Sequence, residues 1–188
     1  ILIFFFTIPS KSFGLIEVDI TRGNLNPLPI AISSLASDNS SQNQLTKLLK
    51  IDDLGLEISK VIENNFRQSG LFNPLDKDSF LQKPDIAHLK PRFEDWSLIK
   101  AQALITGKVT YTEDKLRVEF RLWDVLAAKE MLALAFTTVP KNWRRVGHII
   151  SDKVYERLTG EKGYFDTRII YVSEKGPKTQ RVKKLAIM

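Results

Sequence analysis

Two stretches of the chain carry an apolar residue at every third or fourth position, which predicts two long amphipathic helices. The first follows Asp52-Asp53, which suit a helix start, and ends near Gly70, a common helix stop. The second follows Pro140 and ends near Gly160. The apolar stripes comprise Leu54, Ile58, Val61, Ile62 and Phe66 in the first helix, and Trp143, Val146, Ile150, Val154 and Leu158 in the second.

Other stretches alternate apolar with polar residues, which is the period of a β-strand with one buried face. Residues 116–123 show this alternation most clearly, and Glu113-Asp114 before them predicts a tight turn. Residues 34–44 are rich in Ser, Asn, Asp and Gln, which predicts a loop. The expected strands cover residues 15–21, 28–33, 71–75, 104–109, 116–123 and 131–139, and a short helix is expected over 93–99.

This order of elements predicts an α+β fold, a mixed β-sheet with the two long helices packed on one face. Two further apolar segments, residues 168–172 and 184–188, flank the turn signal Gly176-Pro177 and predict a β-hairpin. An isolated hairpin is marginally stable in water, so we expect the natural chain to continue.

The first residues predict a signal-peptide remnant. Residues 1–8 are almost entirely apolar yet too short to span a bilayer, and Pro9 and the tripeptide Ser12-Phe13-Gly14 follow them. Ser12 and Gly14 would stand at positions −3 and −1 of a signal-peptidase site, where small residues are typical. Cleavage is therefore expected after Gly14. The alternative is that residues 1–8 form a buried core strand.

Composition narrows the possible chemistry. The chain has no cysteine, two histidines and a formal net charge of +6. Neither His88 nor His148 has ligand-type neighbours at metal spacing, and the carboxylate pairs sit where helix caps and turns explain them. We therefore expect no metal, no cofactor and no enzymatic activity.

The basic residues are interpreted as a solvated face rather than a nucleic-acid site. The basic cluster in the last third of the chain lacks the exposed aromatics that stack on bases. The aromatics near it, Tyr164, Phe165 and Tyr171, are interleaved with apolar residues and are expected in the core.

The strand expected at residues 15–21 could serve a partner, because it follows directly after the expected cleavage site. A strand with one free end can detach and pair with the edge of a partner sheet. From the residues alone, the alternative of an ordinary edge strand fixed in its own domain remains open.

Several motifs resemble the TolB family, periplasmic components of the bacterial Tol–Pal system. They run in the family's order along residues 15–188, and the most specific is LTGEKGYFDTRIIYVS at residues 158–173. The other matching segments include residues 16–32, 69–74, 107–109, 122–124, 139–145 and 150–156.

The resemblance implies a periplasmic, non-enzymatic protein in which an α/β domain precedes a six-bladed β-propeller. It implies a signal-peptide remnant at 1–14, a partner-binding strand at 15–26, the α/β domain at 27–160, and a linker with the first propeller strands at 161–188. No nucleic-acid partner is expected, nor a membrane span after signal cleavage.

The implied partners are two proteins, the lipoprotein Pal on the propeller and the C-terminal domain of TolA on the N-terminal segment. The protein would link TolA in the inner membrane to Pal in the outer membrane and would support outer-membrane integrity and constriction at cell division. The alternative is a periplasmic domain that binds another envelope lipoprotein or a peptidoglycan-linked protein. The residues implied to contact TolA are Leu15, Ile16, Glu17, Val18, Asp19, Ile20, Thr21, Arg22 and Gly23.

Overall fold

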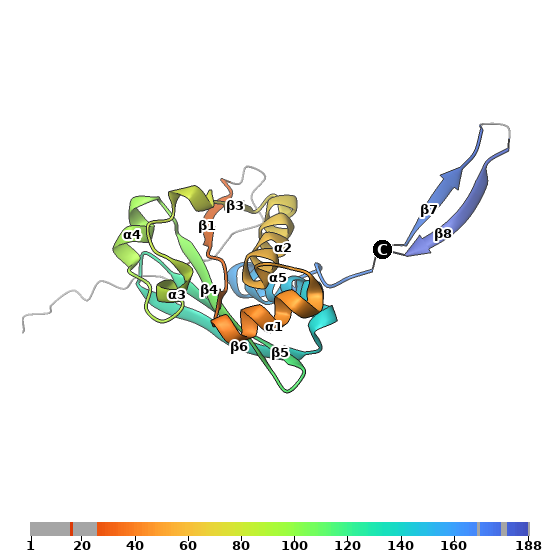
Figure 1. Ribbon diagram of the computed structural model, residues 1–188. Helices are drawn as coiled ribbons and strands as arrows, with labels where there is room; N and C mark the ends of the chain where they lie inside the picture. Colours follow the sequence, from red (N-terminus) through yellow and green to blue (C-terminus); the bar gives the residue numbers. More distant parts are fainter. Residues whose placement is uncertain (1–15, 17–25, 169, 178–179, 188) are drawn as a thin grey trace, which may run out of the picture.

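The computed structural model describes residue 16 and residues 26–188, apart from residues 169, 178–179 and 188. Figure 1 shows the elements in place. In chain order they are β1 (Leu28–Ile32), β2 (Ala36–Ser37), α1 (Asn39–Leu49), α2 (Leu54–Ser69), β3 (Phe72–Pro74), the 3-10 turn η1 (Lys77–Ser79), α3 (Pro84–Ala87), α4 (Phe93–Leu98), β4 (Ala103–Thr112), β5 (Lys115–Asp124), β6 (Lys129–Thr138), the 3-10 turn η2 (Pro140–Asn142), α5 (Trp143–Thr159), β7 (Ile170–Lys175) and β8 (Val182–Ile187).

The main sheet is mixed, as predicted. Its strand order is β3-β1-β4-β5-β6, with the short β2 also paired to β4. β1 runs parallel to both β3 and β4, whereas β4, β5 and β6 form an antiparallel meander. The turn between β4 and β5 is made by Glu113 and Asp114 at positive φ, which confirms the predicted tight turn.

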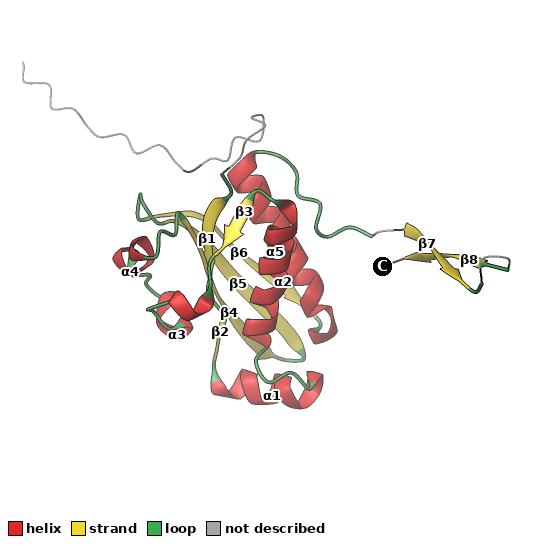
Figure 2. Cartoon of the chain, turned by 90° about the horizontal axis from the view of Figure 1, so that it is seen from above, coloured by secondary structure: helices red, strands yellow, loops and turns green. Residues whose placement is uncertain are grey.

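Helices α2 and α5 cover one face of this sheet (Figure 2). Their predicted apolar stripes point into the core, where Ile62, Phe66, Ile150 and Val154 are fully buried. Burial of each such side chain contributes about 1.5–3 kcal/mol to the free energy of unfolding. The predicted helix ends are also confirmed, since Gly70 and Gly160 are the C-caps.

The opposite face of the sheet is covered at one end only. There Ala87 of α3 and Trp96 of α4 pack on Ala31, Leu104 and Val125 in a second, smaller core cluster. The predicted short helix at 93–99 is therefore confirmed as α4, and it encloses this cluster. The rest of this outer face carries the polar side chains of β4 and β5.

The loop predicted over residues 34–44 is wrong, because β2 and the first half of α1 lie there. The same polar residues that suggested a loop stabilise the helix start: the Asp38 carboxylate accepts hydrogen bonds from the Ser41 backbone N–H and hydroxyl, both at 2.9 Å. Leu45, the helix's single fully buried leucine, secures it to the core.

The predicted C-terminal hairpin is confirmed as β7 and β8, which pair antiparallel in a separate two-stranded sheet. The aromatics of this region correct one expectation, since Tyr164 and Tyr171 are exposed, whereas Phe165 packs against the core. The strand predicted over residues 15–21 lies, apart from Ile16, outside the described residues.

We predict that Asp38→Ala lowers the free energy of unfolding by about 1 kcal/mol, because α1 loses its N-terminal cap. The hydrogen bonds from Ser41 lower the pKa of Asp38 below 3.8, so this contribution is fully present above pH 3.8 and declines as the pH falls through the lower value. Urea denaturation at pH 7 and pH 3 measures both effects. Asp38→Asn, which keeps an acceptor, is the control; an equal loss in both variants at pH 7 would contradict the capping role.

Candidate protein-interaction site

Of the nine residues implied to contact a partner, Ile16 is described by the structure. The other eight, Leu15 and residues 17–23, lie outside the described residues, so the predicted binding strand stays a prediction. Ile16 nevertheless shows where this segment meets the folded domain.

Ile16 is attached to the described part of the domain by a hydrogen bond and by apolar packing. Its backbone N–H donates to Oδ2 of Asp124 over 3.3 Å, across 108 positions of sequence. Its side chain is half-buried and packs against the main core. Because one backbone bond contributes about 0.5–1.5 kcal/mol net, a partner that offers several bonds can displace this attachment.

Asp124 is the functional candidate that the sequence reading missed. It is the last residue of β5 and is 1% exposed, which is unusual for a carboxylate. Its other oxygen, Oδ1, accepts the N–H of Ala127 over 2.8 Å, so the carboxylate also holds the turn that leads to β6. The sequence does contain a signal for its burial. Asp124 continues the every-second-residue pattern of Phe120 and Leu122, which predicts that its side chain faces the core.

Ile16 also lines a groove of about 730 Å³ between β6 and α5. Leu132 and Leu134 form its β6 wall, and Lys153, Glu156 and Arg157 form its α5 wall. Within it, Nε of Arg157 donates to the carbonyl of Met131 over 3.3 Å and ties the helix to the strand. At this point β6 has a β-bulge. Leu122 of β5 pairs with Leu132 of β6 and the next residue, Trp123, pairs with Glu130, so Met131 has no partner in β5.

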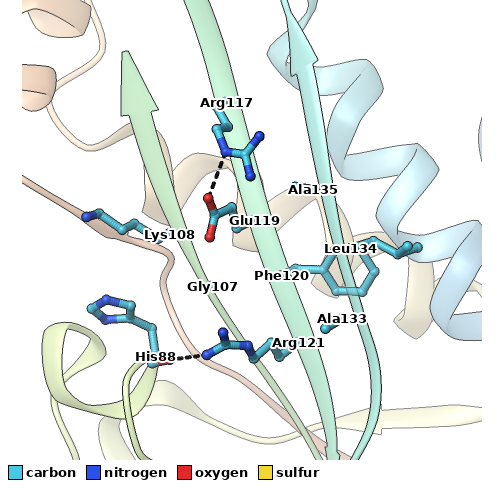
Figure 3. Close-up of a pocket in the computed structure, with 10 residues that line it drawn as sticks. All are labelled: His88, Gly107, Lys108, Arg117, Glu119, Phe120, Arg121, Ala133, Leu134 and Ala135. Atoms are coloured by element: carbon cyan, nitrogen blue, oxygen red, sulfur yellow. Dashed lines mark hydrogen bonds and ion pairs between the residues drawn. The ribbon is translucent and has the colours of Figure 1, made fainter. Parts of the chain in front are cut away.

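A second hollow lies on the outer face of the sheet, beside α3 (Figure 3). Arg117 and Arg121 of β5 flank Glu119, and the guanidinium of Arg117 binds its carboxylate at 2.7 Å. Arg121 donates to the carbonyl of His88 over 3.2 Å, and Lys108 of β4 reaches the same hollow. The arrangement is an open, mainly cationic surface.

Several other titratable groups have structural partners. Asp53 caps α2 and Asp76 caps η1, as the sequence reading of these carboxylates proposed. Burial lowers the pKa of Lys77, whose ammonium donates to Ser59 over 2.8 Å. His148 Nδ1 lies 3.0 Å from the amide nitrogen of Asn65, which places it in the contact between α2 and α5.

Among the residues that the structure describes, no three His, Cys, Asp or Glu side chains are grouped so as to hold a metal ion. No helix among those residues has the length and apolar character needed to cross a membrane.

We predict that Asp124→Asn weakens the attachment of Ile16, because an amide group offers one acceptor oxygen for two N–H donors. Hydrogen exchange of the Ile16 amide, followed by NMR, should accelerate about fivefold or more. Glu130→Gln, on the exposed pair with Arg121, is the matched control and should leave this exchange rate unchanged. Unchanged exchange in Asp124→Asn would show that the carboxylate does not hold the segment.

Comparisons with known proteins agree with this fold. Residues 16–131 match the family described as the TolB amino-terminal domain. The chain is 77% identical over 186 residues to the Tol-Pal system protein TolB of Pelagibacter ubique (strain HTCC1062), covering 99% of this chain and 42% of that protein. It therefore spans less than half the length of that relative.

A solved structure is similar in fold. The crystal structure of TolB from Acinetobacter baumannii aligns with a TM-score of 0.66 at 23% identity, covering 92% of this chain and 39% of that one. This likeness supports the α+β architecture with its mixed sheet. Because the family match over residues 16–131 covers more than half of the chain, the chain belongs to the TolB amino-terminal domain family.

Proposed function

We propose that this chain acts in the periplasm as a protein-interaction component of the Tol–Pal system rather than as an enzyme. Membership of the TolB amino-terminal domain family and the 77% identity to a Tol-Pal system protein support this role. The expected signal-peptide remnant at residues 1–14, which would be removed on export, is consistent with it.

The proposed partner of the N-terminal segment is the C-terminal domain of TolA, which residues 15–23 would bind by adding a strand to its sheet. The observation that carries this proposal is the weak attachment of Ile16 to Asp124, a single backbone hydrogen bond of 3.3 Å. A strand of residues 15–21 can form several backbone bonds to a partner sheet, and each of them would compete with the bond between Ile16 and Asp124.

The alternating pattern of the segment suits this role. Ile16, Val18 and Ile20 would present one apolar face to the partner, while Glu17 and Asp19 would stay on the polar face. In the free chain, the apolar contact of Ile16 with the domain would compete with the partner at high effective concentration. Binding would therefore be an exchange of Ile16 between two docking places.

The domain organisation proposed with this function has a partner-binding segment at 15–26, the α/β domain at 27–160, and the first propeller strands at 161–188. The hairpin supports the last part, because the apolar side chains of Ile170 and Leu185 are 67% and 80% exposed and further strands would cover them. Pal would bind to the complete propeller, and through it the chain would connect TolA to the outer membrane.

We predict that the chain starting at Leu15 binds the TolA C-terminal domain and that a chain starting at Pro27 does not. Val18→Pro should also abolish binding, because proline removes a donor from the added strand, while the melting temperature stays nearly unchanged. Calorimetric titration and a thermal melt measure the two quantities, with Lys47→Gln on α1 as a control that should bind normally.

Binding that survives in the chain starting at Pro27 would place the interface on the folded domain and contradict the proposal. Binding by neither chain would favour another envelope lipoprotein or a peptidoglycan-linked protein as the partner.

A further inference from the structure

The strand β6 has one free long side. Among the described residues it pairs with β5 alone and stands at the end of the sheet order. Over its ten residues, its two charged side chains, Lys129 and Glu130, lie at the start, and it contains no proline. Natural edge strands usually carry charges, prolines or bulges that prevent pairing. The bulge of β6 lies at Met131, so residues 132–138, which carry none of these features, are a template for another strand.

On the side of the sheet that faces the helices, this free edge opens onto apolar side chains. Leu132, Leu134 and Phe136 form a row there, and Leu134 is 36% exposed. The row borders the groove beside α5 that Ile16 also lines. A strand added to β6 would place every second side chain over this row.

On the outer side of the sheet, basic side chains of β5 lie next to the free edge strand. Here β6 contributes Ala133 and Ala135, which pair with Arg121 and Glu119 of β5 and are too small to cover them. Figure 3 shows these alanines beside β5, which carries Arg117, Glu119 and Arg121, with Lys108 on the far side of β5. The alternate side chains of an added strand could therefore reach a surface with an excess of positive charge.

We propose that β6 receives an extended segment of a partner protein in which apolar residues alternate with acidic ones. The apolar residues would pack on Leu132 and Leu134. The carboxylates would pair with Arg121 and Arg117, in competition with Glu130 and Glu119. A polypeptide fits this site better than a lipid or a nucleic acid, because the edge offers a row of backbone N–H and C=O groups that another backbone matches. The inference goes beyond the proposed function, in which the chain supplies a strand and does not receive one.

The test uses the whole chain and a capped peptide of eight residues in which valine and glutamate alternate. Amide chemical shifts recorded by NMR during titration should change most at residues 132–138, with an affinity at least about tenfold higher than that of the matching valine–lysine peptide. The same valine–glutamate peptide methylated at its four central amides should not bind, since it cannot donate to the strand.

Variants of the chain test the charge contribution. Arg117→Gln combined with Arg121→Gln should weaken the peptide about fivefold. Lys60→Gln combined with Arg67→Gln removes the same charge from the exposed face of α2 and should leave the affinity unchanged. Urea denaturation confirms that both double variants remain folded.

Four outcomes would overturn the proposal. They are no binding at millimolar peptide, equal binding of the valine–lysine peptide, shifts centred away from β6, and an equal effect of the two double variants. Self-association of the chain through β6, seen by sedimentation, would likewise overturn it by making a second copy the occupant.

Discussion

The antiparallel register between β4 and β5 determines which side chains face the helices and which face outward. The two-residue turn at Glu113 and Asp114 sets the ten pairs, from Thr112 with Lys115 to Ala103 with Asp124. Because side chains alternate, a slip of one residue would move Val118 and Phe120 out of the core and bring arginines into it. The packing of α2 and α5, and both surfaces described for β6, depend on this register.

The same register gives Asp124 its position. It is the last of the inward-facing residues of β5, so its carboxylate is buried where the strand ends. A buried carboxylate without hydrogen-bond donors is costly, and two backbone N–H groups, from Ala127 and Ile16, supply them. The turn to β6 and Ile16 therefore meet at one side chain.

The parts of the fold that local pattern determines could be predicted from the sequence. The stripe of α5 and the alternation of β5 are long and regular, and Gly160 ends the helix where expected. The helix α1 could not be predicted, because its polar composition favours a loop. Its position depends on contacts distant in sequence, such as the hydrogen bond that the Ser41 hydroxyl accepts from the N–H of Tyr111. The Ile16–Asp124 bond joins residues 108 positions apart, so no local pattern predicts it. The alternation along β5 predicts only that the Asp124 side chain faces the core.

We propose that the segment whose Ile16 binds Asp124 is also the partner-binding strand, so that binding to Asp124 and binding to the partner exclude each other. The proposal is tested by the NMR signals of the Ile16 and Ala127 amides, both donors to Asp124, during titration with the TolA C-terminal domain. We expect the Ile16 signal to move as the complex forms, while the Ala127 signal keeps its hydrogen-bonded position. An Ile16 signal that stays in place when TolA is saturated would contradict it.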